Sequence, residues 1–161
     1  MLKIHEHTVE VANKDDPLFK QLSTSDLFRH LEHYAHHPHE YFEPLETSEV
    51  QEVFENERHF LKRSLHFSRM TVNDRVEFTD NQTMVTEVDG TDDYPRSRLT
   101  IKIEMTQAQD CIKLHFIYEE DIAEPPQDDI FLSLRRKAYE QKDRDLVEHI
   151  RHQAGCLSEL S

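Results

Sequence analysis

The sequence predicts a single α+β domain in which helices cover one face of a curved antiparallel sheet. The first observation is an alternation of apolar and polar residues between Ser48 and Asp121, interrupted by short polar turns. The second is a helical spacing of apolar residues over about 127–154. The third is the order of these segments, because a run of strands precedes one long helix instead of alternating with helices. A chain of 161 residues is long enough to bury one core of this kind.

The N-terminal quarter is expected to hold one strand and one helix. The opening LKIHEHTVEVA alternates as a strand does. Ser25 or Asp26 is expected to cap a helix that ends before Pro38, and EYFEPL is expected to add a short helical turn. The apolar residues of this helix recur at helical spacing: Leu27, Phe28, Leu31 and Tyr34.

Six strands are expected in the central part of the chain. They are SEVQEVFE, HFLKRSLHF, MTVNDRVEF, QTMVTEV, RLTIKIEM and CIKLHFIYEE. Two-residue turns at NE, SR and DN join several of them, and DGTDDYP and TQAQD form longer loops.

The C-terminal helix carries the signals of a helix start and stop. Asp128 and Asp129 lie in its first turn and basic residues in its last, which complements the helix dipole, and Gly155 is the expected C′ residue. The apolar residues expected on its buried face are Ile130, Phe131, Leu134, Ala138, Leu146 and Ile150.

Composition excludes several classes of function. The formal charge of −14 opposes binding to nucleic acid or anionic membrane surfaces. Only two glycines occur, so a glycine-rich phosphate-binding loop is not expected. No apolar run is long enough to span a bilayer, and the first residues lack the apolar core of a signal peptide. Cys111 and Cys156 form no CxxC motif, which favours a reduced, cytoplasmic protein.

Strand alignment places three charged residues on the apolar face. With a two-residue turn at 68–69, the facing pairs are Phe67 and Met70, Leu65 and Val72, and Arg63 and Asp74. A turn at 80–81 sets Val76 opposite Val85 and Asp74 opposite Glu87. The remaining hairpins place Val50 beside Arg63, Ile101 opposite Phe116, and Leu99 opposite Tyr118.

The expected polar row of Arg63, Asp74 and Glu87, with Tyr118 near the same level, has three interpretations. It is a structural network that fixes the register of the sheet, a polar anchor for a ligand, or an acid/base site. Two carboxylates beside one arginine leave a surplus negative charge, which raises one carboxyl pKa. The guanidinium can bind one carboxylate with two hydrogen bonds and still reach a second.

The chain resembles the SRPBCC superfamily, which includes START, polyketide-cyclase and Bet v 1-like proteins, and within it the AtaL-like branch. The resemblance rests on SDLFRHLEHYAHHPHEYFEPLETSEV, the strands NDRVEF, LTIKIEM and LHFIYEE, and the final EHIRHQA. It implies a helix-grip fold, in which a curved sheet wraps around the long C-terminal helix and leaves a ligand cavity. Members of the superfamily bind lipids, sterols, polyketides or other apolar molecules, and a minority catalyse cyclisation or hydrolysis.

The histidines do not predict a metal site. In HLEHYAHHPHE, His33 lies three residues after His30 and four before His37, but there is no HExxH motif. His5 and His7 share one face of the first strand. We expect no metal and no cofactor. The acidic segment EEDIAEPPQDD lacks EF-hand spacing, and Cys111 has no predictable base beside it.

These observations predict binding of a small, mostly apolar, lipid-, polyketide- or aromatic-like molecule between the sheet and the C-terminal helix. The expected cavity residues are Arg63, Asp74, Glu87, Tyr118, Leu65, Phe67, Val72, Val85, Ile101, Phe116, Leu134 and Ala138. One alternative is a cyclase or hydrolase in the same cavity, with Glu87 or Asp74 as base and Tyr118 as donor. Another is a protein-interaction module without a small ligand. The sequence determines neither the ligand nor the oligomeric state.

Overall fold

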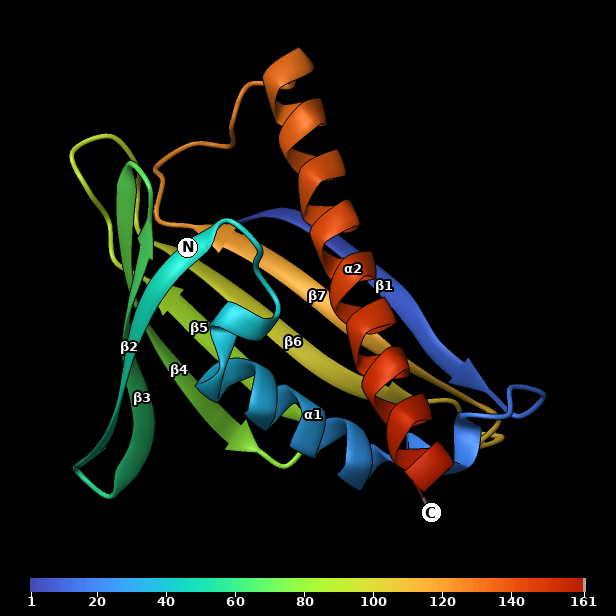
Figure 1. Cartoon of the computed structure of the whole chain (residues 1–161). Helices are drawn as coiled ribbons and strands as arrows, with labels where there is room; N and C mark the ends of the chain where they lie inside the picture. Colours follow the sequence, from blue (N-terminus) through green and yellow to red (C-terminus); the bar gives the residue numbers. More distant parts are fainter. Residues whose placement is uncertain (161) are drawn as a thin grey trace.

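The computed structural model describes residues 1–160 as one sheet with helices on its concave side (Figure 1). The strands are β1 (Leu2–Asn13), β2 (Leu45–Glu55), β3 (Arg58–Phe67), β4 (Met70–Asp80), β5 (Thr83–Val88), β6 (Ser97–Met105) and β7 (Cys111–Glu120). The helices are α1 (Thr24–His36) and α2 (Ile130–Leu160), with short 3-10 helices η1 (Phe19–Gln21) and η2 (Pro38–Glu40). All the expected strands and both expected α-helices are present.

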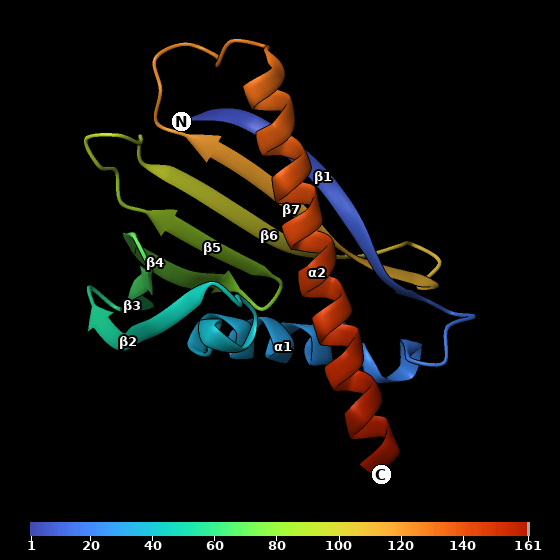
Figure 2. The ribbon, with the colours of Figure 1, turned by 45° about the horizontal axis from the view of Figure 1, so that its top comes forward.

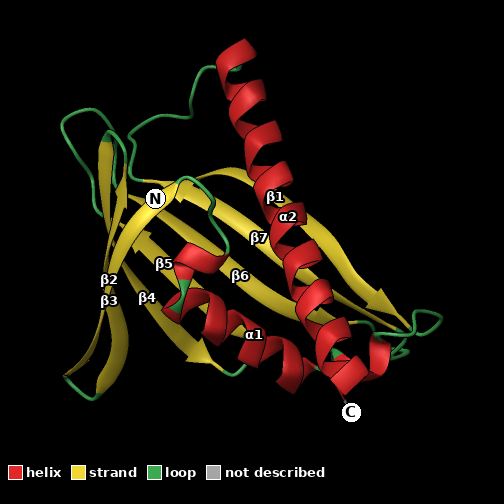
Figure 3. Ribbon diagram, in the orientation of Figure 1, coloured by secondary structure: helices red, strands yellow, loops and turns green. Residues whose placement is uncertain are grey.

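The sheet has the order β1-β7-β6-β5-β4-β3-β2, and every neighbouring pair is antiparallel. Figure 2 shows α2 crossing the face of this sheet, with α1 beside the C-terminal half of α2. Both helices lie on the same side of the strands, as the colouring by secondary structure makes plain (Figure 3). The core lies between these layers and includes the fully buried Leu31, Phe116 and Ile150.

Helix α1 begins two or three residues earlier than the sequence predicts, since Ser25 or Asp26 was the expected N-cap. Its N-cap is Ser23, whose hydroxyl accepts a hydrogen bond from the Asp26 backbone nitrogen at 3.1 Å. The Asp26 side chain accepts from the Ser23 backbone nitrogen in return, which completes a capping box. Asp26 is therefore not the N-cap itself. It is the third residue of the helix, and its side chain completes the capping box.

The expected buried face of α2 is wrong in its first half. Leu134 is 55% exposed, Ala138 is exposed, and Leu132 and Tyr139 face the protein instead. The reason is the helical period: Leu134 and Ile150 are separated by sixteen residues, which is almost four and a half turns. Their side chains therefore lie on nearly opposite sides of the helix, and only the C-terminal part of the predicted stripe contacts the sheet.

Helix α2 continues through Gly155, so the prediction that this glycine ends the helix is wrong. A Cβ at this position would lie 3.8 Å from the Leu18 side chain, an ordinary van der Waals distance. We expect Gly155→Ala to raise the free energy of unfolding by up to about 1 kcal/mol, because alanine loses less backbone entropy in a helix. Urea unfolding checks this, and a destabilised variant would contradict it.

The register of the sheet agrees with the expectation in all hairpins except one. Arg63 pairs with Asp74, Val50 with Arg63, and Leu99 with Tyr118, as expected. Between β4 and β5, an irregularity between Phe78 and Asp80 moves the turn to residues 81–82. The shift sends each side chain of β5 to the face opposite the expected one.

This shift removes two expected residues from the concave face. Glu87 pairs with Arg75, and Val85 pairs with Glu77, so both point to the convex side. Thr86 takes the inward position beside Val76. The predicted row of one arginine and two carboxylates is therefore wrong.

Candidate ligand site on the concave face

Arg63 and Asp74 form a buried pair that also reaches α1. Arg63 donates to both carboxylate oxygens of Asp74, from Nε at 2.8 Å and from Nη2 at 2.7 Å. Its Nη1 donates to the carbonyl of Ala35 in the last turn of α1, at 2.9 Å. The two residues are 6% and 4% exposed. Because every nitrogen of the guanidinium already has an acceptor, the pair connects β3 and β4 to α1.

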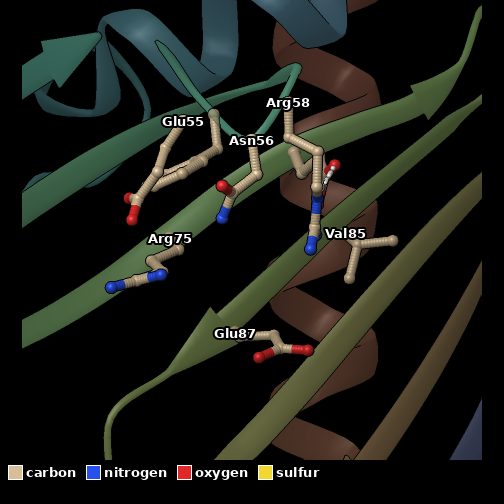
Figure 4. Close-up of a pocket in the computed structure, with 8 residues that line it drawn as sticks. Glu55, Asn56, Arg58, Arg75, Val85 and Glu87 are labelled. Carbon is tan, nitrogen blue, oxygen red and sulfur yellow. Dashed lines mark hydrogen bonds and ion pairs between the residues drawn. The ribbon is translucent and has the colours of Figure 1, made fainter. Parts of the chain in front are cut away.

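Glu87 lies away from this pair, on the outer surface. Its carboxylate is 3.8 Å from a guanidinium nitrogen of Arg96 and 3.8 Å from one of Arg98. It lines a pocket of about 310 Å³ on the convex face, where Figure 4 shows Glu87 and Val85 with Arg75. A second pocket, of about 270 Å³, lies outside the sheet–α2 interior, at the start of α1.

A second polar cluster lies between the sheet and α2, centred on Asp143. The Tyr118 hydroxyl of β7 lies 2.9 Å and 2.7 Å from the two carboxylate oxygens. The His7 Nε2 of β1 lies 2.7 Å from Oδ2. Asp143 is only 1% exposed, and burial raises its pKa. Burial and the charge of Asp143 raise the pKa of Tyr118, so its hydroxyl stays protonated and donates.

Aromatic side chains and one lysine surround this cluster. The Tyr118 ring stacks on Tyr139 of α2 with centroids 4.1 Å apart, and His7 stacks on Phe116 at 5.2 Å. The Nζ atom of Lys142 lies 5.2 Å from the centroid of the Tyr118 ring. Burial lowers the pKa of Lys142, against the opposing effect of the Asp143 charge.

Most of the expected site residues that belong to strands lie on the concave face. Besides Arg63, Asp74 and Tyr118, these are Leu65, Phe67, Val72, Ile101 and Phe116. Only Tyr118 belongs to the Asp143 cluster. Asp143 and Lys142 were not among the residues predicted from the sequence, and His7 was given no role in the site. Asp143 shares the helical spacing of Tyr139, Leu146 and Ile150, and this spacing was a signal that could have identified it.

Apolar side chains on the concave face are only partly covered. Helix α2 packs chiefly against β1, and α1 packs against β6. On the strands toward the other edge of the sheet, the half-buried apolar side chains are Val50 of β2, Phe67 of β3, Val72 of β4 and Leu99 of β6. This leaves apolar area for another molecule to cover, next to the buried polar groups.

Within the part of the chain that the structure describes, no group of three or more potential ligands is placed to hold a metal. His33 contacts Glu40, and the rings of His33 and His37 lie 4.5 Å apart without a third ligand. Nor is any helix in the described range both long and apolar enough to cross a membrane.

Comparison with solved structures identifies the same fold. The di-domain ARO/CYC StfQ from the steffimycin biosynthetic pathway matches with a TM-score of 0.67 at 10% identity, over 98% of this chain and 53% of that one. The chain thus spans about half of that protein. XoxI from Bacillus cereus matches with a TM-score of 0.61 at 11% identity, over 98% of this chain and 99% of XoxI. A START superfamily protein from Mycobacterium smegmatis matches with a TM-score of 0.57 at 13% identity, over 92% of this chain and 97% of that one.

These likenesses confirm the expected START-like helix-grip fold. No curated protein matches the sequence. A family model does match, over residues 6–155, and its description is acetylaranotin biosynthesis cluster protein L. The match covers nearly the whole chain and confirms the resemblance drawn from the sequence. The chain belongs to the AtaL family.

Proposed function

We propose that the protein binds a small, mostly apolar molecule between the concave face of the sheet and α2. The observation that carries this proposal is the set of half-buried apolar side chains on that face, among them Val72 and Leu99. A ligand that covers them gains the free energy of removing apolar area from water. The START-like fold and the family support the same role.

The polar end of the ligand is assigned to the Asp143 cluster. Arg63 and Asp74, which belong to the row that the sequence offered as a possible anchor, already satisfy each other and the Ala35 carbonyl. In the described part of the chain, Asp143 and Tyr118 bond to each other, whereas the amine of Lys142 beside them has no hydrogen-bond partner and is free to meet a polar group of the ligand. Pockets of this kind combine apolar walls with a few convergent polar groups.

Binding of a neutral fluorescent probe, N-phenyl-1-naphthylamine, tests the location of the site. We expect Val72→Trp to weaken probe binding at least tenfold, because the larger side chain occupies the concave face. Val85→Trp is the matched control, since Val85 is also a half-buried strand valine but points to the convex face. Equal binding by both variants, each shown to be folded by circular dichroism, would contradict the proposed location.

Mass spectrometry of gently purified protein tests for a resident ligand. An organic mass that is present under native conditions and lost on denaturation supports a carrier and gives the size of its ligand. Absence of such a mass together with absence of probe binding would favour a protein-interaction module.

A cyclase or hydrolase in the same site is the second candidate. Asp143 favours it, because a buried carboxyl with a raised pKa, held by Tyr118 and not by Arg63, is suited to general acid/base chemistry. In this case Asp143 replaces Glu87 and Asp74 as the expected base. Chemical change of a bound ligand by the wild type, absent in Asp143→Asn, distinguishes the enzyme from the carrier.

A further inference from the structure

The amine of Lys142 faces aromatic rings between α2 and β7. Its Nζ atom lies 5.2 Å from the ring centroid of Tyr118 and 5.8 Å from that of Tyr139. The two rings are stacked with an angle of 11° between their planes, so they lie face to face, and the amine lies beside both. As a residue, Lys142 is half-buried.

Lys142 has no counter-ion among the residues whose side chains the structure describes: no carboxylate oxygen lies within 4.0 Å of its Nζ. Lysine normally brings its charge to water or to a carboxylate. The adjacent Asp143 does not serve as that partner, because Tyr118 and His7 occupy its carboxylate.

An amine in this environment is a better nucleophile than an ordinary lysine. Burial lowers the pKa of Lys142, so a larger fraction of the amine is neutral at a given pH below its ordinary pKa. Only the neutral amine has a free electron pair for attack on an electrophilic carbon. Desolvation beside aromatic surface is a recognised way to activate lysine for this chemistry.

Groups that hold and move protons lie next to the amine. Tyr118, whose ring contacts Lys142, donates its hydroxyl proton to Asp143, and Asp143 contacts His7. A carboxyl whose pKa is raised by burial can supply a proton to a departing hydroxyl and later accept one. The nucleophile and the proton-transfer groups therefore occur in one cluster.

We propose that Lys142 captures the carbonyl carbon of a small apolar aldehyde or ketone as an imine. The inference deepens the proposed ligand site and rests on it. The nitrogen adds to the carbonyl carbon and loses a proton while the carbonyl oxygen gains one, which gives a carbinolamine. The hydroxyl group of the carbinolamine is protonated and leaves as water, a carbon–nitrogen double bond forms, and the nitrogen releases its remaining proton. One carbonyl and one amine thus give one imine and one water, without an oxidant or reductant.

Reductive trapping of the full-length protein tests this step. The protein is incubated at pH 7 with 2-naphthaldehyde and sodium cyanoborohydride, which reduces an imine to a stable amine, and the adducts are located by peptide mass spectrometry. We expect Lys142 to be labelled at least tenfold more than Lys137, an exposed lysine on the same helix. The ratio should fall as the pH approaches the ordinary pKa of lysine, about 10.4, because the advantage of an amine with a lowered pKa disappears there.

Two variants serve as controls. Lys142→Met keeps an unbranched side chain, one atom shorter and without the amine, and should abolish the dominant adduct, whereas Lys137→Met should leave it unchanged. Equal labelling of all lysines, or a ratio that does not vary with pH, would overturn the inference. If naphthylamine binds and Val72→Trp blocks it, while Lys142 stays unlabelled, the ligand site stands and the imine is rejected. If neither reagent reacts or binds, the proposed function itself fails.

Discussion

Replacement of Arg63 by methionine is expected to lower the free energy of unfolding by about 3–5 kcal/mol, the largest effect that a single substitution should have here. The variant leaves the Asp74 carboxylate, 4% exposed, without its two hydrogen bonds from the guanidinium. It also leaves the carbonyl of Ala35 at the end of α1 without its donor. Chemical denaturation followed by circular dichroism measures the loss.

The double variant Arg63→Met, Asp74→Leu is the control for this experiment. It removes both charges and fills the space with apolar atoms, so most of the lost stability should return. A double variant as unstable as the single one would show that packing, and not an unpaired charge, causes the loss.

The same pair of variants separates a structural role from a ligand anchor. Because each nitrogen of Arg63 already donates within the protein, the folded double variant should bind naphthylamine as the wild type does. A binding loss of tenfold or more in a folded double variant would restore the anchor interpretation of this pair.

The second large effect concerns Asp143. Asp143→Ala should be less stable than Asp143→Asn by about 1–3 kcal/mol, because alanine leaves the buried hydroxyl of Tyr118 without an acceptor. Asparagine keeps a carbonyl oxygen in the same place and carries no charge. Parallel urea titrations of the two variants measure the difference, and equal stabilities would show that the hydrogen bond contributes nothing.

The wild type should lose stability relative to Asp143→Asn as pH rises. Burial raises the pKa of Asp143 in the folded state above its ordinary value of 3.8, so the unfolded chain releases this proton at a lower pH. The protonated carboxyl contributes its full stabilisation when the pH is below the ordinary pKa of 3.8. This contribution declines as the pH rises and is lost once the pH passes the folded-state pKa. Other carboxyl groups titrate in both proteins and cancel in the difference.

Denaturation at intervals between pH 4 and pH 8 follows this difference. The free energy of unfolding of Asp143→Asn, minus that of the wild type, should increase with pH over this range. A difference that is flat or decreases would mean that the hydrogen bonds of Tyr118 and His7 outweigh burial at the carboxyl.

Local patterns in the sequence predicted the elements well and their faces less reliably. The alternation from Ser48 onward identified every strand between β2 and β7, because alternation follows directly from the geometry of a strand. One extra residue near Thr79 was sufficient to place Glu87 and Val85 on the wrong face. A bulge has no clear signature in a single sequence, and its effect reaches every later residue of the strand.

The sequence by itself determined the fold class, the pairing of Arg63 with Asp74, and the concave position of Tyr118. Each depends on spacing within one element or across one short hairpin. Only the tertiary structure decided that Arg63 also donates to the Ala35 carbonyl of α1, and that the Asp143 carboxylate bonds to Tyr118 and His7. Those contacts join residues 25 to 136 positions apart. Such contacts depend on how α1 and α2 rotate and cross the sheet, which no local period specifies.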